Sequence, residues 1–257
     1  MTLEEAKILA EQGNTDAMMA LVQHYMKDKD NDESYALACI YQERAAEAGD
    51  ANAIVQLAQA SRAHASFMLQ MVECTGKDDN TIESLEKCHK WSRKLVQTVK
   101  ELNIHGETEQ FSTEFYLDSI FWLSAIYSLD ENYKGILQIT EDVAHPVAQA
   151  LCGMATLYTQ SKLTVNSSNR AYTLLKNVEH PSFWDDKYSR TQTLEILRIE
   201  VGLAFCKLLR IWGKTNSAYD TLSDFLAKTK DPALKDIIQK EMSNYHKTFL
   251  GNYKYID

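Results

Sequence analysis

One motif of small residues recurs in this chain at the spacing of a helical hairpin. The pattern Gly-x-x-x-Ala-x-x-x-Leu occurs at residues 13–21 and again, 36 residues later, at 49–57. Small residues let two antiparallel helices approach closely, while the leucine positions fill the space between successive hairpins. Because a single hairpin cannot bury its apolar face alone, units of this length have to stack on one another. The motif therefore predicts a helical solenoid.

Other parts of the chain carry related repeats. The second helix of each unit aligns at a shift of 50, with Ala38, Tyr41, Arg44 and Ala45 matching Cys88, Trp91, Lys94 and Leu95. Residues with the spacing of Ala17, Leu21 and Tyr25 recur as Ser119, Leu123 and Tyr127, and His145-Pro146 recurs 35 residues later as His180-Pro181. The small residues Ala148 and Gly153, which follow His145-Pro146, indicate a tightly packed helix pair.

The remaining sequence is helical in its periodicity, and no segment alternates convincingly as a strand would. Glycine and proline number only 9 and 3, too few for an all-β domain of 257 residues. Helix ends are predicted at the capping box of Thr2 and Glu5, at the N-cap Asp231-Pro232, and at Gly213 after the amphipathic run from Arg190 to Trp212. A last apolar stripe consists of Leu234, Ile238, Met242, Tyr245 and Phe249.

These patterns predict an all-α fold, namely a right-handed α-α superhelix (solenoid) of about five helical hairpins with a C-terminal capping helix. We expect one helical-repeat domain over residues 1–257. The repeats are clearest over 10–100, looser over 111–180, and degenerate or capping over 183–257.

The repeats resemble the Sel-one-like repeat family, which is related to the tetratricopeptide repeats. Residues 10–49 are closest to the family pattern, and the run from Glu86 to Lys94 is similar to its second-helix motif. Two departures put regular superhelical curvature in doubt: an acidic turn at 27–33 replaces the glycine-rich one, and the second unit is extended between residues 60 and 80. The resemblance implies a non-catalytic protein-interaction scaffold.

Charge is unevenly distributed along the chain. The net charge is −9, and it divides into −7 for residues 1–60, +2 for 61–100, −8 for 101–160 and +4 for 161–257. A nucleic-acid-binding protein uses a basic stripe to neutralise phosphates, and only the last segment is basic, and weakly so. The acidic blocks are typical of a protein with a basic protein partner, although solubility alone explains them equally well. Nucleic acid is not an expected partner.

Several classes of site are excluded by what the sequence does not contain. No two glycines lie within ten residues of each other, which excludes clustered glycine loops for dinucleotides or phosphates. The five cysteines form no C-x-x-C pair, and the histidines form no H-E-x-x-H motif, so we expect no metal and no cofactor. The acidic start lacks the features of a signal peptide, and no run is apolar enough to span a membrane. We expect a cytoplasmic location with no membrane contact.

Two motifs that could carry chemistry are better explained without it. Asp28, Asp30 and Asp32 have the spacing of a calcium loop, but Glu33 stands where that loop needs glycine, and Cys39 stands where it needs glutamate. A solvated acidic turn is the preferred interpretation.

Ser84 and Lys87 match the S-x-x-K motif of penicillin-recognising hydrolases, but the partner motifs Ser-Asp-Asn and Lys-Thr-Gly are absent. Both residues are expected on the surface of an amphipathic helix. Cys88, which aligns with an alanine, is interpreted as a small core residue.

The family pattern directs certain residues of each first helix to the inner surface of the solenoid. Met, Phe and Arg side chains beside polar groups are typical of a protein-binding groove. The candidate partner-binding residues are Asp16, Met19, Gln23, Met26, Gln59, Arg62, Asp118 and Phe121, with Asn52 and Val55 on the same face. The alternative is that Met19 and Phe121 belong to the core, with the helix register one residue off.

The leading functional hypothesis is a non-catalytic protein-interaction scaffold and not an enzyme. A sharper form is an immunity or inhibitor protein that binds a basic toxin or effector, which rests on analogy with small acidic helical-repeat proteins. The alternatives are a penicillin-recognising hydrolase using Ser84 and Lys87, or a general adaptor with no toxin partner. A nucleic-acid-binding solenoid is opposed by the charge distribution.

Overall fold

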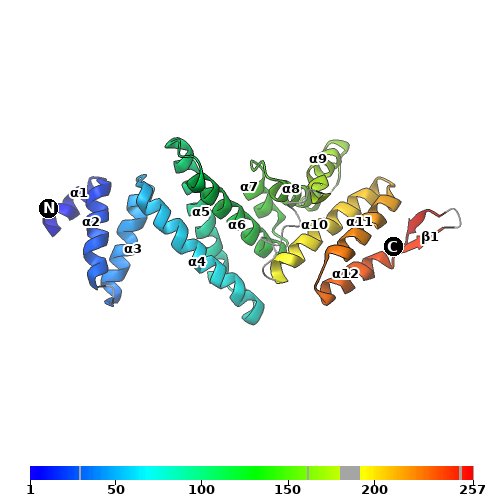
Figure 1. Cartoon of the computed structure of the whole chain (residues 1–257), viewed down its shortest axis with the longest axis horizontal. Helices are drawn as coiled ribbons and strands as arrows, with labels where there is room; N and C mark the ends of the chain where they lie inside the picture. Colours follow the sequence, from blue (N-terminus) through cyan, green and yellow to red (C-terminus); the bar gives the residue numbers. More distant parts are fainter. Residues whose placement is uncertain (29, 161, 180–191, 249–250, 257) are drawn as a thin grey trace. The chain divides into compact units, whose positions relative to one another are not determined.

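The computed structural model describes residues 1–28, 30–160, 162–179, 192–248 and 251–256 (Figure 1). It is 80% helical, with twelve α-helices and one two-stranded hairpin among these residues, so the predicted all-α helical-hairpin fold is confirmed. The chain divides into two compact units, Met1–Ser119 and Ile120–Asp257. The right-handed superhelix and the single domain stay predictions. Among the described residues, no helix has both the length and the apolar character that crossing a bilayer requires.

The first unit is a series of helical hairpins. Its elements are α1 (Leu3–Glu11), α2 (Thr15–Tyr25), the 3₁₀ turn η1 (Met26–Asp28), α3 (Asp32–Glu47), α4 (Ala51–Thr75) and α5 (Asp79–Glu101), followed by the start of α6 (Glu107–Leu129), which continues into the second unit. Within this unit α2 packs on α3 and α4 packs on α5, and α3 also contacts α4. The two hairpins are the two copies of the sequence repeat.

The repeated glycine forms the same corner in both copies. Each glycine has a positive φ, +88° and +99°, and its amide donates to the carbonyl oxygen three residues before it, at 3.0 and 3.1 Å. The next residue, asparagine or aspartate, then caps the following helix by accepting a 2.8 Å hydrogen bond from the alanine amide of the motif. The corner residues are Gly13, Asn14 and Ala17 in the first copy and Gly49, Asp50 and Ala53 in the second. The motif thus ends one helix and starts the next.

A basic residue in the second helix of each hairpin, α3 and α5, reaches back to the C-terminal end of an earlier helix. Arg44 of α3 donates to the carbonyl oxygen of Ala10 at 3.4 Å and to the carboxylate of Glu11 at 2.7 Å, at the end of α1. Lys94 of α5, which aligns with Arg44, donates at 3.0 Å to the carbonyl oxygen of Glu47 at the end of α3. Because a helix C-terminus carries unpaired carbonyls and partial negative charge, a cation placed there stabilises it.

The buried positions follow the aligned repeats. Ala38, Ala45, Cys88 and Leu95 are all buried, as the shift of 50 predicts, and Trp91 is fully buried where Tyr41 is half-buried. Ser119 and Leu123 of α6 are buried like Ala17 and Leu21 of α2. The interpretation of Cys88 as a core residue is confirmed.

The second unit continues with shorter hairpins and ends in strands. Its further elements are α7 (Tyr133–Thr140), α8 (Pro146–Tyr158), α9 (Val165–Leu175), η2 (Lys176–Glu179), α10 (Gln192–Ile211), α11 (Thr215–Lys228), α12 (Pro232–Met242), β1 (Tyr245–Lys247) and β2 (Tyr253–Tyr255). The packed pairs are α7 with α8, α8 with α9, and α10 with α11.

One helix pair of this unit, α8 with α9, meets at a glycine. A Cβ built on Gly153 of α8 would lie 2.8 Å from the amide nitrogen of Leu175 in α9, so the predicted close approach is confirmed. His145 caps α8 through its side chain, and Pro146 is the first helical residue, as the corner motif predicts. The second copy of that corner, His180-Pro181, lies outside the described residues.

The end of the chain differs from the prediction. The apolar stripe predicted to run as a helix through Tyr245 stops at Met242, and Tyr245 begins β1, which pairs antiparallel with β2. Aromatic residues favour strands, and Gly251, with a φ of +81°, lies in the turn between the two strands. Phe249, the last residue of the predicted stripe, lies outside the described residues.

Candidate functional site

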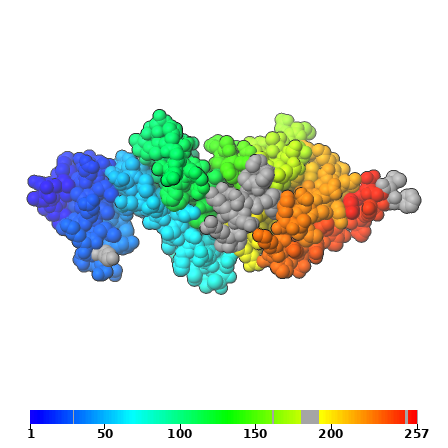
Figure 2. Space-filling model, viewed as in Figure 1, coloured from blue at the N-terminus to red at the C-terminus, as the bar shows by residue number. Residues whose placement is uncertain are grey.

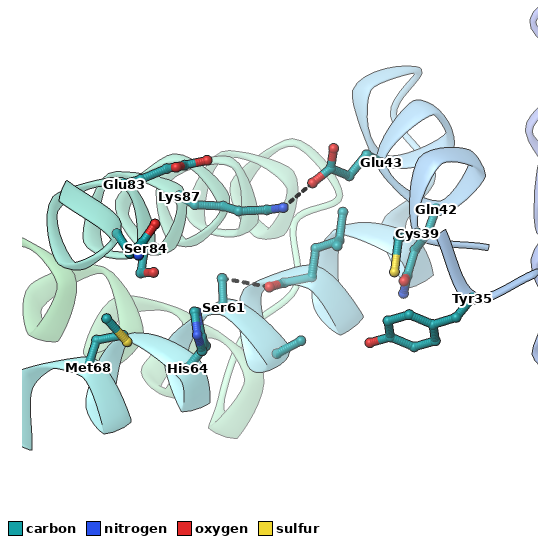
Figure 3. Close-up of a pocket in the computed structure, with 13 residues that line it drawn as sticks. Tyr35, Cys39, Gln42, Glu43, Ser61, His64, Met68, Glu83, Ser84 and Lys87 are labelled. Atoms are coloured by element: carbon teal, nitrogen blue, oxygen red, sulfur yellow. Dashed lines mark hydrogen bonds and ion pairs between the residues drawn. The ribbon is translucent and has the colours of Figure 1, made fainter. Parts of the chain in front are cut away.

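A groove of about 690 Å³ lies in the first unit between α3, α4 and α5 (Figure 3). The α4 side contributes residues spaced three and four apart, which places them on one face of that helix. The lining residues are Tyr35, Cys39, Gln42 and Glu43 of α3, Leu57, Ala60, Ser61, His64 and Met68 of α4, and Asn80, Glu83, Ser84 and Lys87 of α5. None of these belongs to the predicted inner surface, so sequence reasoning missed this groove as a binding site.

The charged side chains of the groove come from α3 and α5. The ammonium group of Lys87 on α5 forms an ion pair with the carboxylate of Glu43 on α3, as Figure 3 shows. Glu83, one turn before Lys87, is exposed. The hydroxyl of Ser61 donates to the carbonyl oxygen of Leu57 in its own helix, at 2.6 Å. The groove therefore has charged side chains on its α3 and α5 walls, and its α4 floor combines the apolar Leu57, Ala60 and Met68 with Ser61 and His64.

The two residues of the hydrolase hypothesis both line this groove, but their geometry does not suit acyl transfer. Ser84 is buried, whereas both residues were expected on the surface of the helix. Lys87 extends away from Ser84 and pairs with Glu43 (Figure 3). A lysine that activates a serine has to lie within hydrogen-bond reach of its hydroxyl, and Lys87 instead reaches across the groove to Glu43.

The candidate binding residues of α2, η1 and α4 are exposed or half-buried. Asp16, Gln23 and Met26 are exposed, Met26 at 43%, while Met19 is half-buried against the core of the unit. On α4, Asn52 and Gln59 are exposed, whereas Val55 and Arg62 are half-buried. Met19 therefore fits neither interpretation fully: it is partly packed in the core and partly accessible on the predicted binding surface.

Two candidate residues of α6 are not exposed, which corrects their assignment as surface contacts. Asp118 is buried, and its carboxylate accepts hydrogen bonds from Arg62 at 2.6 and 3.2 Å. The guanidinium of Arg62 also lies 4.3 Å from the ring centroid of Phe115. Phe121 is only 2% exposed. Arg62 and Asp118 therefore bind each other, and Phe121 is part of the core.

The sequence held a signal for this correction. Residues 119–129 contain no charged side chain, and a helix that is apolar on every side is buried on every side. Alignment with α2 located the buried positions of α6 correctly. It also predicted an exposed face around Asp118 and Phe121, but residues 118–126 of α6 include no exposed residue.

His89 of α5 is a polar contact that sequence reasoning did not single out for a role. Its ring stacks on Tyr116 at 5.4 Å between centroids, and its Nδ1 lies 3.2 Å from the hydroxyl oxygen of Ser119. Burial, with a smaller contribution from the nearby Arg93 charge, lowers the pKa of His89 from 6.5 to about 4. Burial likewise raises the pKa of the neighbouring Cys88 thiol to about 11, which makes a thiolate nucleophile unfavourable there.

The acidic turn before α3 caps a helix. Asn31 accepts hydrogen bonds from the amides of Glu33 and Ser34, and Asp28 and Asp30 are exposed. No group of three or more His, Cys, Asp or Glu that could hold a metal ion occurs among the described residues.

The two units differ strongly in charge. Residues 1–119 carry a net charge of −10 (blue to green in Figure 2), and residues 120–257 carry +1, which together make the −9 of the chain. The groove lies in the acidic unit. Its walls hold two carboxylates, Glu43 and Glu83, against the single ammonium of Lys87.

No protein-family model matches the chain, and neither the curated proteins nor the solved structures contain a match.

Proposed function

We propose that this chain is a non-catalytic protein-interaction scaffold whose first unit binds a basic segment of a partner protein. The observation that carries the proposal is that the unit holding the groove carries all of the chain's net negative charge, −10 against +1 for the other unit. A charge of this size attracts a basic partner over several ångströms and raises the rate of productive encounter.

The accessible faces of the first unit supply the short-range contacts that charge alone lacks. Exposed Met26, the first residue of η1 directly after α2, offers an adaptable apolar contact, and Met68 offers another in the groove. Apolar contacts of this kind control the rate of dissociation, while charges at the rim control the rate of association.

The repeated corners and the cations Arg44 and Lys94, which contact the C-terminal ends of α1 and α3, favour a stacked helical repeat of the Sel-one-like kind. In this proposal the repeats present a surface and catalyse nothing. If the partner is a basic toxin or effector, the chain acts as its inhibitor or immunity protein.

Quantitative affinity capture from native lysate tests the proposal. The wild-type chain is compared with a first-unit variant, Asp16→Lys with Glu33→Lys, and with a second-unit control, Asp220→Lys with Asp236→Lys; all four residues are exposed. Each pair changes the net charge by the same amount. We expect basic proteins that are enriched by the wild type and by the control and lost from the first-unit variant. Equal enrichment by all three proteins contradicts the proposal.

A further inference from the structure

The groove between α3, α4 and α5 has a floor and walls of different chemistry. The floor includes Leu57 and Met68 of α4, and the walls present Glu43 from α3 and Glu83 from α5. Lysine and arginine side chains have this same division, because an aliphatic stem carries a charged end. A long basic side chain can therefore contact Leu57 and Met68 along its stem while its charged end reaches a carboxylate on the wall.

We propose that this groove takes a lysine or arginine side chain from an extended segment of the partner, together with an apolar residue next to it. The inference rests on the proposed function and names the part of the first unit that does the binding. Charge complementarity selects the occupant, because an acidic or neutral segment would leave Glu83 without a counter-charge.

Within the protein, Lys87 competes with an incoming basic side chain for the carboxylate of Glu43. The ion pair of Lys87 with Glu43 joins α5 to α3 across the groove and occupies one of the two carboxylates (Figure 3). Glu83 is thus the first contact of an arriving cation, and Glu43 becomes a second one when Lys87 moves aside. Replacing Lys87 by an uncharged, unbranched side chain should strengthen binding of a basic guest.

Tyr35 adds a contact at the α3 end of the groove. Its side chain lines the groove and the residue is 51% exposed. A tyrosine ring attracts a cation over its face, more strongly as water is removed. The ring therefore favours the same occupant as the two carboxylates.

Methyl NMR of the full-length chain tests the proposal at defined positions. The methionine methyl groups are labelled with ¹³C, and the signals of Met68 and Met26 are assigned through Met68→Leu and Met26→Leu. The probe is an acetylated and amidated nonapeptide in which lysine and leucine alternate. A nonapeptide in which glutamate and leucine alternate is the control. We expect the Met68 signal to shift on titration with the lysine peptide, while the glutamate peptide leaves it unchanged.

Substitutions in the walls then separate the groove from general acidity. Glu83→Gln should weaken the lysine peptide about tenfold, as the loss of one charge-assisted contact predicts. Glu101→Gln is the matched control, because it makes the same change at an exposed site near the end of the same helix and should leave affinity within about twofold. Lys87→Met should strengthen binding severalfold. Circular dichroism confirms that each variant is folded.

The outcomes distinguish the groove from the proposed function. One outcome is a shift confined to the Met26 signal, with equal effects of Glu83→Gln and Glu101→Gln on affinity. This outcome overturns the groove proposal, although a basic segment still binds the first unit. Absence of any methyl shift with the lysine peptide overturns the groove proposal, and the affinity capture described above then decides on the function separately. Met68 shifts whose titration Glu83→Gln weakens about tenfold, while Glu101→Gln leaves it within about twofold, support both proposals.

Discussion

Two polar side chains hold the first part of α6 in its place within the first unit. Arg62 reaches it from α4 through Asp118, and His89 reaches it from α5 through Tyr116 and Ser119. Buried polar groups are costly unless paired, so each of these contacts favours one position of α6 over neighbouring ones. Residues that resembled a binding surface thus hold the helices together.

The Arg62–Asp118 contact makes a direct prediction about stability. Asp118→Asn removes the charge that faces the guanidinium, and it should lower the free energy of unfolding by about 1–3 kcal/mol. Asp16→Asn is the control, because Asp16 holds the aligned position in α2 and is exposed. Its effect should stay within about 0.5 kcal/mol. Urea denaturation measures both, and equal effects would show that the buried pair contributes nothing.

His89 predicts a pH dependence with a defined sign. Because the folded state holds its pKa near 4 and the unfolded state has 6.5, the unfolded chain binds the proton more readily between these values. The contribution of His89 is therefore constant above about pH 6.5 and is lost as the pH falls toward 4. Relative to His89→Gln, the wild type should lose about 2 kcal/mol of unfolding free energy between pH 7 and pH 5. A difference that stays constant over this range contradicts the assignment.

At the residue scale, the sequence predicted which positions are buried better than it predicted which charged side chains contact each other. The aligned repeats identified the buried Ala, Leu and Cys positions, because apolar spacing follows the helix period. They could not show that Arg62 and Asp118, 56 residues apart, meet on neighbouring helices. A charged residue on a helix face has the same spacing whether it meets solvent or a partner in the fold.

Among the elements, the corner built on Gly13 and Gly49 explains why the repeat could be found in the sequence. A positive φ at the end of a helix strongly favours glycine, and the next residue must cap a new helix. The positive φ and the helix cap each depend on one residue at a fixed position, so both can be recognised in the sequence. The groove could not be predicted in the same way, since α3, α4 and α5 form it from residues up to 52 positions apart, between Tyr35 and Lys87.

The equivalence of the two corners can be tested with one substitution made twice. Gly13→Ala and Gly49→Ala should each lower the free energy of unfolding by about 1–2 kcal/mol, the cost of a side chain in left-handed backbone. No atom lies within 4 Å of a Cβ built at either site, so strain in the backbone is the only cost. Gln12→Ala, one residue earlier, is the control and should change little. Clearly unequal losses for the two glycines would contradict the equivalence.

The predicted last helix shows where periodicity misleads. Leu234, Ile238 and Met242 keep the helical spacing, and Tyr245 continues it by chance although it begins a strand. In β1 its ring instead packs edge-on against Tyr255 and Tyr219, at 4.9 and 5.7 Å between centroids. A single apolar residue at this spacing is compatible with a helix and with a strand. Only the turn residues on either side of it could have distinguished the two.

At the scale of the whole chain, the charge is divided along the same boundary as the two compact units. The first unit is strongly acidic, whereas acids and bases nearly balance in the second. The predicted middle block of −8 over residues 101–160 spans this boundary, and five of its nine acids fall in the first unit. A basic partner should therefore be attracted by the first unit specifically, rather than by two separate acidic blocks.

The salt dependence of association follows from this asymmetry. Against the basic partner recovered by affinity capture, Asp16→Lys with Glu33→Lys should slow association roughly tenfold at low salt, because the rate depends on long-range attraction. The difference should shrink toward nothing near 1 M salt, where the screening length falls to about 3 Å. Asp220→Lys with Asp236→Lys changes the total charge equally but lies in the second unit, and should slow association much less.

Dissociation rates should agree among all three proteins, since neither pair touches the apolar contacts. Surface plasmon resonance across a salt series measures both rates. Equal slowing by the two pairs would mean that net charge alone attracts the partner, and that the acidic unit has no special role.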